Sequence, residues 1–173
     1  MPTSPSVQNY HIGKGIVSFK ETGSSIFTDL GNAPKFIYTP KTTKKEHFSS
    51  REGIKTKDFT AITQIGATVK VTLDEITAEN LAMFALGTLT AGTDGTGTIT
   101  GLTKAEFTGT LKVEGTNDIG QHVSWTGDIS FVPSGDFSFI TDADDFSTIV
   151  LEAEVQKATD GSFGTWTVAQ PTA

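Results

Sequence analysis

The sequence contains few side chains whose type and spacing could support metal or acid–base chemistry. Three histidines, His11, His47 and His122, lie in unrelated segments. No two of them stand four residues apart, the spacing that places two histidines on one face of a metal-binding helix. The chain has no cysteine, which excludes thiolate zinc ligands, a cysteine nucleophile and disulfides. We therefore expect no metal site.

Two short motifs resemble ligand loops without meeting their requirements. Asp142, Asp144 and Asp145 are spaced like the start of a calcium loop. This run lacks the glycine at loop position 6 and the glutamate at position 12, so we interpret it as an acidic turn. The segment Gly13-Lys14-Gly15 lacks the spacing of a phosphate loop, and the chain has no Gly-x-Ser-x-Gly elbow. The sequence therefore predicts no cofactor and no enzymatic activity.

Charge is distributed unevenly along the chain. The net charge is −7, but residues 1–70 hold ten Lys/Arg and five Asp/Glu, whereas residues 71–173 hold three Lys/Arg and fifteen Asp/Glu. Six basic residues fall within residues 41–58: Lys41, Lys44, Lys45, Arg51, Lys55 and Lys57. Such asymmetry suggests an electrostatic partner, and a solvated basic loop is the alternative. The stretch has one aromatic residue, Phe48, and no nucleic-acid module, so a protein partner is favoured over DNA.

Strand patterns dominate the positions between these segments. Apolar residues occupy most odd positions from Phe59 to Leu73, which predicts one unusually long strand with a buried face. Such a strand should bend at Gly66 or extend to a neighbouring subunit. Residues 107–114 and 123–131 read as a hairpin, residues 149–155 as a further strand, and Asp160-Gly161 as a hairpin turn into residues 163–168. Residues 12–19 and 36–39 give weaker strand patterns.

One segment follows a helical pattern instead. Residues 77–86 are predicted to form a short helix, with Thr77 as its N-cap and Gly87 just past its end. Residues 88–101, rich in Gly and Thr, are expected to form a flexible loop or tip. The predicted fold is mainly β: an antiparallel β-sandwich or barrel with one short helix and a long inter-strand loop at 41–58.

The sequence predicts a single domain over residues 1–173, with residues 1–9 as an N-terminal arm. No apolar run approaches the ~18 residues that span a bilayer. The first residues lack the basic and apolar regions of a secretion signal. We therefore expect no membrane association and synthesis in a cytoplasm.

Three stretches, in this order, resemble the major tail tube proteins of long-tailed (siphovirus-type) bacteriophages. They are residues 25–34 (SIFTDLGNAP), 44–58 (KKEHFSSREGIKTKD) and 73–87 (LDEITAENLAMFALG). The resemblance covers about half of the chain, roughly residues 10–87, and continues beyond it only as a strand pattern.

The resemblance implies a structural protein of the virion tail, assembled in the host cytoplasm as a homo-oligomer. The resemblance also implies hexameric rings that stack into a tube, in which each subunit gives strands to a continuous inner β-barrel. DNA is then expected to pass through an acidic lumen without specific binding, with other tail proteins at the tube ends. By the same resemblance, segment 41–58 is expected to be a loop that contacts the adjacent ring. We expect its self-assembly contacts at Lys44, Lys45, Phe48, Arg51, Ile54, Lys55 and Lys57.

Three alternatives remain open at this point. A monomeric β-sandwich could bind carbohydrate or a cell surface, with Trp166, Tyr10 and Tyr38 as candidate platforms. Another phage protein, such as a tail terminator or a capsid decoration protein, would form one closed ring or sit on a shell. A small hydrolase with a dispersed site is the least favoured alternative.

Overall fold

A computed structural model describes residues 9–51, 53–93, 96–132, 135–140 and 146–170. Most of the predicted N-terminal arm, residues 1–8, lies outside the described residues, as do Asp142, Asp144 and Asp145 of the predicted acidic turn. The described part consists mainly of antiparallel strands with one short helix, which confirms the predicted fold class.

Eight strands form one antiparallel sheet in the order β2-β1-β7-β8-β9-β4-β3, and β10 also pairs with β8. Their bounds are β1 Gly15–Glu21, β2 Thr28–Asp29, β3 Lys35–Ser49, β4 Thr56–Leu73, β7 Phe107–Gly115, β8 His122–Val132, β9 Ile149–Val155 and β10 Thr165–Ala169. A separate hairpin joins β5 (Thr88–Ala91) to β6 (Gly97–Thr100). Helix α1 (Ala78–Phe84) contacts β5, β6 and β9.

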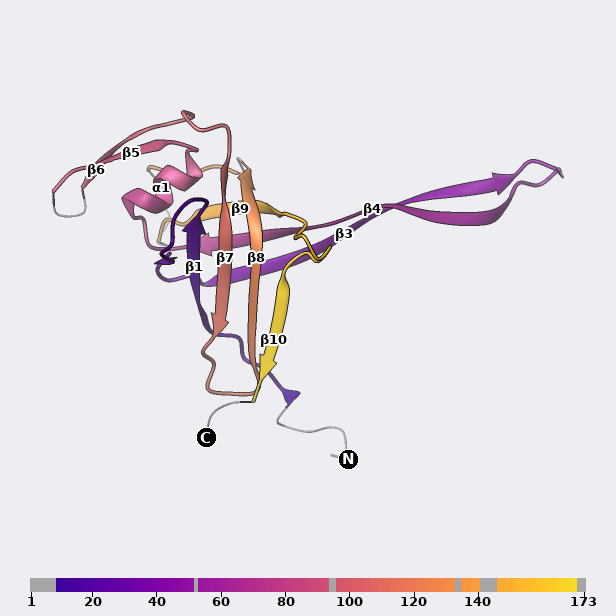
Figure 1. The fold of residues 1–173 in the computed structure, drawn as a ribbon, viewed down its shortest axis with the longest axis horizontal. Helices are drawn as coiled ribbons and strands as arrows, with labels where there is room; N and C mark the ends of the chain where they lie inside the picture. The colour runs from indigo at the N-terminus through magenta and orange to yellow at the C-terminus, as the bar shows by residue number, and fades with distance from the viewer. Residues whose placement is uncertain (1–8, 52, 94–95, 133–134, 141–145, 171–173) are drawn as a thin grey trace.

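The sheet divides along β8 and folds over on itself. One edge of β8 pairs with β7, while the other edge pairs with β10 near its start and with β9 near its end. As a result β1, β7, β8 and β10 run steeply across β4 and β3 (Figure 1). The core lies between these two layers, with Leu111, Trp125 and Ile129 from one and Val69 and Leu151 from the other. This is the sandwich-like packing that alternating strands favour.

The helix prediction is confirmed, apart from the residue that ends it. The Thr77 side chain accepts a hydrogen bond from the Asn80 N–H, as an N-cap does. At the other end Leu86, not Gly87, has the left-handed conformation, with φ 44°. The N–H groups of Leu86 and Gly87 donate to the carbonyls of Met83 and Ala82, which is the Schellman pattern. Glycine at 87 instead allows close approach, since a Cβ there would lie 2.8 Å from the Thr100 carbonyl oxygen of β6.

Three other predictions are wrong, in each case because strand pairing was missed or misassigned. Most of the segment 41–58 is not a loop but the paired ends of β3 and β4. The expected flexible loop at 88–101 contains the β5–β6 hairpin. Asp160 and Gly161 do form a turn, yet the strand after it pairs with β8 rather than with β9. Each error concerns a polar or short segment.

Trp125 of β8 lies in the core, where it is 2% exposed. Its indole ring packs against two glycines, Gly127 and Gly164. Gly164 has φ +86°, and a Cβ at this position would lie 2.4 Å from the Trp125 Nε1 atom. The backbone of Gly164 thus closes one side of the core, just before β10 begins.

We predict that Gly164→Ala lowers the free energy of unfolding by at least about 2 kcal/mol, because it adds a steric clash to the strain of a positive φ. The matched control is Gly161→Ala, at φ +87°, where the nearest atom to a Cβ is Lys157 Cε at 3.6 Å. The control should lose only about 1 kcal/mol, from backbone strain alone. Urea denaturation measures both, and equal losses would contradict the packing role of Gly164.

Candidate assembly surface

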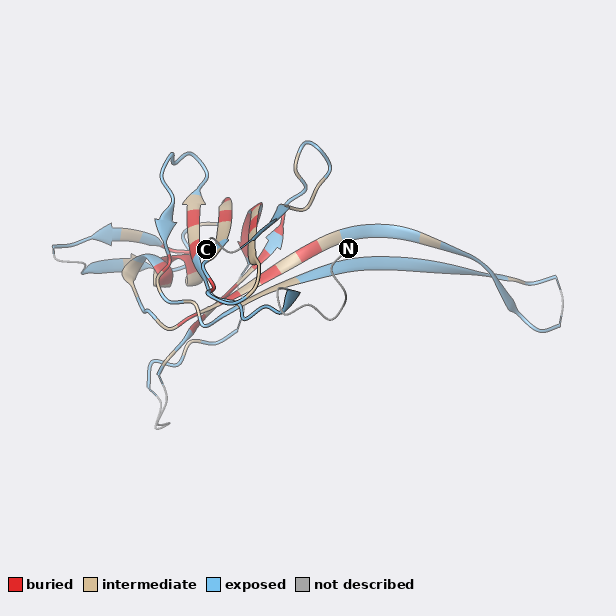
Figure 2. Cartoon of the chain, turned by 90° about the horizontal axis from the view of Figure 1, so that it is seen from below, coloured by how far each residue is buried: buried red, intermediate tan, exposed pale blue. Residues whose placement is uncertain are grey.

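Strands β3 and β4 leave the core together as a two-stranded ribbon. They pair along their whole length, from Lys35↔Thr72 to Ser49↔Thr56. Only the end of β4, from Thr68 to Leu73, also pairs with β9. Residues 56–67 of β4 therefore have β3 as their one partner among the described strands, over roughly 40 Å at ~3.3 Å per residue. Figure 2 shows this ribbon projecting from the core, exposed over most of its length. We call residues 41–67 the ribbon.

One face of the ribbon continues the buried face of the sheet. Side chains alternate along β3, so Thr42, Lys44 and Phe48 lie on the same side as the core residues Phe36 and Tyr38. The cross-strand partners of Thr42 and Lys44 are Ile65 and Ile62, and paired residues share a face. This stripe, Ile65, Ile62 and Phe48, is 63%, 58% and 45% exposed. An apolar face therefore runs out of the core and stays uncovered.

Two register shifts explain why Ile62 lies on the core side and Phe59 on the opposite face, whereas Ile65 keeps the predicted side and is exposed because the ribbon has left the core. The pairing skips Thr63 between Thr43 and Lys44, and Asp58 between His47 and Phe48. Each extra residue on β4 changes which side chains face the core side. The prediction of one buried face over 59–73 therefore holds only for Ala67, Val69, Val71 and Leu73. Phe59, at 64% exposure, pairs with His47 on the opposite face.

The ribbon is also basic, and most of its cations have no partner within the chain. Lys57 donates to Glu46 across the two strands at 2.9 Å, and His47 Nδ1 lies 2.6 Å from an Asp58 oxygen. In the described part of the chain, no ion pair or hydrogen bond holds the side chains of Lys41, Lys44, Lys45, Arg51 and Lys55. These five charges are therefore available to acidic groups outside the subunit.

The predicted contact residues all lie on the ribbon, but Lys44 and Lys45 point to its opposite faces. Lys44, Lys45 and Phe48 lie on β3 and Lys57 lies on β4. Arg51, Ile54 and Lys55 lie between the two strands at the far end, where Ile54 is 82% exposed. Sequence reasoning missed the apolar members Phe59, Ile62 and Ile65, because their alternation looked like a core-facing strand. The signal for their exposure was the excessive length of that strand.

An aromatic cluster holds the root of the ribbon. Tyr38 packs against Trp125 at 5.7 Å and against Trp166 at 5.0 Å between ring centroids. The Tyr38 hydroxyl donates to the Phe163 carbonyl oxygen, and desolvation by burial raises the pKa of this side chain. Tyr38 is thus a packing residue rather than a free platform for sugar. Trp166 and Tyr10 remain 51% and 58% exposed.

Other kinds of site have little support in the described residues. These residues contain no group of three or more His, Asp or Glu side chains that could hold a metal ion. Likewise, the described residues include no helix with the length and apolar character needed to span a membrane.

Comparison with known proteins identifies a family and a fold. The chain belongs to the family described as "Protein of unknown function UCP028589", which matches residues 10–151. No curated protein matches the sequence. Among solved structures, a chain of the "Cryo-EM structure of the anti-feeding prophage (AFP) baseplate, 6-fold symmetrised" has a similar fold. The TM-score is 0.53 at 9% identity, and the match covers 96% of this chain and 97% of that chain.

We predict that the free energy of unfolding depends on the buried end of β4, residues 68–73, and only weakly on its exposed part, residues 56–67. Leu73→Ala should lower the free energy of unfolding of the unassembled protein by about 2–5 kcal/mol, since Leu73 is fully buried. Ile65→Ala removes an isomeric side chain from the same strand, yet should cost less than about 1 kcal/mol. Chemical denaturation in dilute solution compares the two. A large loss for Ile65→Ala would mean that the ribbon face is already covered within the subunit.

Proposed function

We propose that this chain is a structural subunit of a phage tail or of a related tail-like particle. In this proposal it forms hexameric rings that stack into a tube, and the tube serves as a conduit for DNA. The observation that carries the proposal is the ribbon: a two-stranded extension with an uncovered apolar face and unpaired cations. An isolated hairpin is marginally stable in water, so the ribbon requires a partner surface. A second copy of the chain is the partner that a self-assembling tube provides.

The fold comparison and the charge distribution support this proposal. The structural neighbour comes from a baseplate with six-fold symmetry. The match covers 96% of this chain and 97% of the neighbour's chain. The acidic remainder of the chain complements the basic ribbon on an adjacent copy. An acidic lumen would also repel phosphate groups, so DNA would pass without specific binding. Other tail proteins would occupy the tube ends, and the tube would belong to the virion after assembly in the host cytoplasm.

The proposed contact between rings combines charged and apolar side chains of the ribbon. Acidic groups of the next ring would face four cations, Lys44, Lys45, Arg51 and Lys55. Phe48 and Ile54, exposed in the single subunit, would be buried against the same ring. Exposed ion pairs contribute only ~0–1 kcal/mol each, so the apolar side chains provide much of the affinity. The charges then mainly select the orientation and the correct partner surface.

Negative-stain electron microscopy of the concentrated protein, with its mass in solution measured alongside, tests the proposed function. We expect hollow tubes or stacked six-fold rings. Single rings that never stack would favour a terminator-like protein. A uniform monomer at every concentration that binds polysaccharide through Trp166 would favour the carbohydrate-binding alternative. Either of these results would contradict the tube.

Reversing the charges of Lys44, Lys45, Arg51 and Lys55 to Glu should prevent tube growth and leave the fold intact, because all four are exposed on the ribbon. Tube mass by sedimentation and folding by circular dichroism are the measurements. The control reverses Lys14, Lys35 and Lys157, which are exposed outside the ribbon. Normal tube growth by the ribbon variant, or equal loss in the control, would show that the ribbon charges do not direct assembly.

A further inference from the structure

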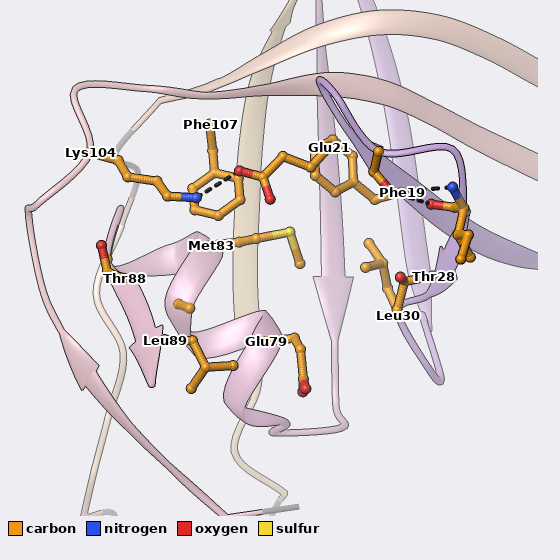
Figure 3. Close-up of a pocket in the computed structure, with 14 residues that line it drawn as sticks. Phe19, Glu21, Thr28, Leu30, Glu79, Met83, Thr88, Leu89, Lys104 and Phe107 are labelled. Atoms are coloured by element: carbon orange, nitrogen blue, oxygen red, sulfur yellow. Dashed lines mark hydrogen bonds and ion pairs between the residues drawn. The ribbon is translucent and has the colours of Figure 1, made fainter. Parts of the chain in front are cut away.

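A groove lies between helix α1, the β1–β2 segment and strand β5 (Figure 3). Its volume is about 330 Å³ and its floor is formed by core side chains, among them Leu30, Met83 and Phe107. Ile26, 71% exposed, adds an apolar side chain at the rim. Ligand pockets span ~300–1,000 Å³, so this groove is large enough for one or two side chains of a partner.

The rim of the groove presents one carboxylate that lacks a partner. Lys104 Nζ donates to Glu21 at 2.6 Å and lies 3.8 Å from the centre of the Phe107 ring, so both charges are satisfied within the chain. Glu79 is exposed, and the described part of the chain provides no ion pair or hydrogen bond to its side chain. The groove therefore combines an apolar floor with a free negative charge at its edge.

The end of the ribbon has the complementary composition. Ile54 is the most exposed apolar side chain there, at 82%. Lys55 follows it directly and Arg51 lies three residues before it, while Glu52 between them is outside the described residues. Neither cation has an intrachain partner in the described residues. An apolar side chain between two cations matches an apolar groove beside a carboxylate, in both charge and character.

The two surfaces lie at opposite ends of the subunit. The far end of the ribbon extends to one extreme of the longest axis, while α1 and β5 lie at the other (Figure 1). A subunit cannot place its own ribbon in its own groove in this conformation. It can place it in the groove of another copy, and that copy's ribbon remains free to continue. A contact between two different surfaces is heterologous: it closes into a ring where the rotation between copies closes, and otherwise extends as a filament.

We propose that the end of the ribbon docks in this groove of the next copy, with Ile54 against the floor and Arg51 or Lys55 at Glu79. This inference rests on the proposed function and deepens it, because it names the receptor for the ribbon. It assigns α1 and β5 a role in assembly that the family resemblance did not give them.

Site-directed cross-linking tests the pairing of these two surfaces. The chain has no cysteine, so Gly53→Cys combined with Thr88→Cys places one thiol beside Ile54 at the ribbon end and one at the exposed rim of the groove. A Cβ at Gly53 would meet nothing within 4 Å, and Ile54 itself stays in place. Treated with a short bis-maleimide, the double variant should give a ladder of covalent multimers on a denaturing gel. The control pairs Gly53→Cys with Thr165→Cys, an exposed position on β10 outside the groove, and should give no ladder. Circular dichroism checks that both variants are folded.

Electron microscopy of the same samples separates the two proposals. Tubes with a ladder support both of them. Tubes without a ladder, or with equal ladders in the variant and the control, overturn the docking in the groove and leave the proposed function standing. A ladder from particles that are not tubes supports the docking and contradicts the tube. Neither tubes nor ladder at high protein concentration would overturn both.

Discussion

The structure depends on the pairing of β4, a single strand that passes through two environments. From Thr68 to Leu73 it is held between β3 and β9, and its odd side chains are buried in the core. From Thr56 to Ala67 it has β3 as its one partner among the described strands. The buried root fixes the register of both strands, so it also fixes which side chains the ribbon presents. One end of β4 therefore stabilises the subunit, and the other end carries the proposed assembly surface.

The two kinds of side chain on the ribbon contribute differently to association. Burying one large aliphatic or aromatic side chain fully is worth about 1.5–3 kcal/mol, whereas an exposed ion pair is worth ~0–1 kcal/mol. Even partial burial of Phe48, Ile62 and Ile65 thus outweighs several surface pairs. The unpaired lysines have a second effect before assembly, since charge on an exposed edge opposes random strand pairing. In the proposed assembly the apolar stripe would set the strength of the contact, and the cations would restrict which surface can cover it.

How much the sequence predicts depends on whether the signal is local. The β7–β8 hairpin, β9 and the start of α1 follow from alternation and capping within a few residues, and the structure confirms them. Residues 41–49 carry no apolar alternation, and they form a strand only because β4 pairs with them. The register shifts at Thr63 and Asp58 likewise depend on both strands. Composition alone located the basic residues of the candidate site. The alternation of apolar residues, by contrast, wrongly assigned Ile65 to the core.

The asymmetry of the subunit constrains the kind of assembly that it can form. A self-complementary contact would pair the ribbon with a second ribbon, and two surfaces rich in unpaired lysines would repel each other. The complementary surface must therefore be a different one, of opposite charge, and the groove beside Glu79 has that character. Subunits that carry a protrusion at one end and a hollow at the other join head to tail, so an assembly that does not close into a ring has two different ends. In the proposed tube such contacts set no length, and other components of the particle would have to set it.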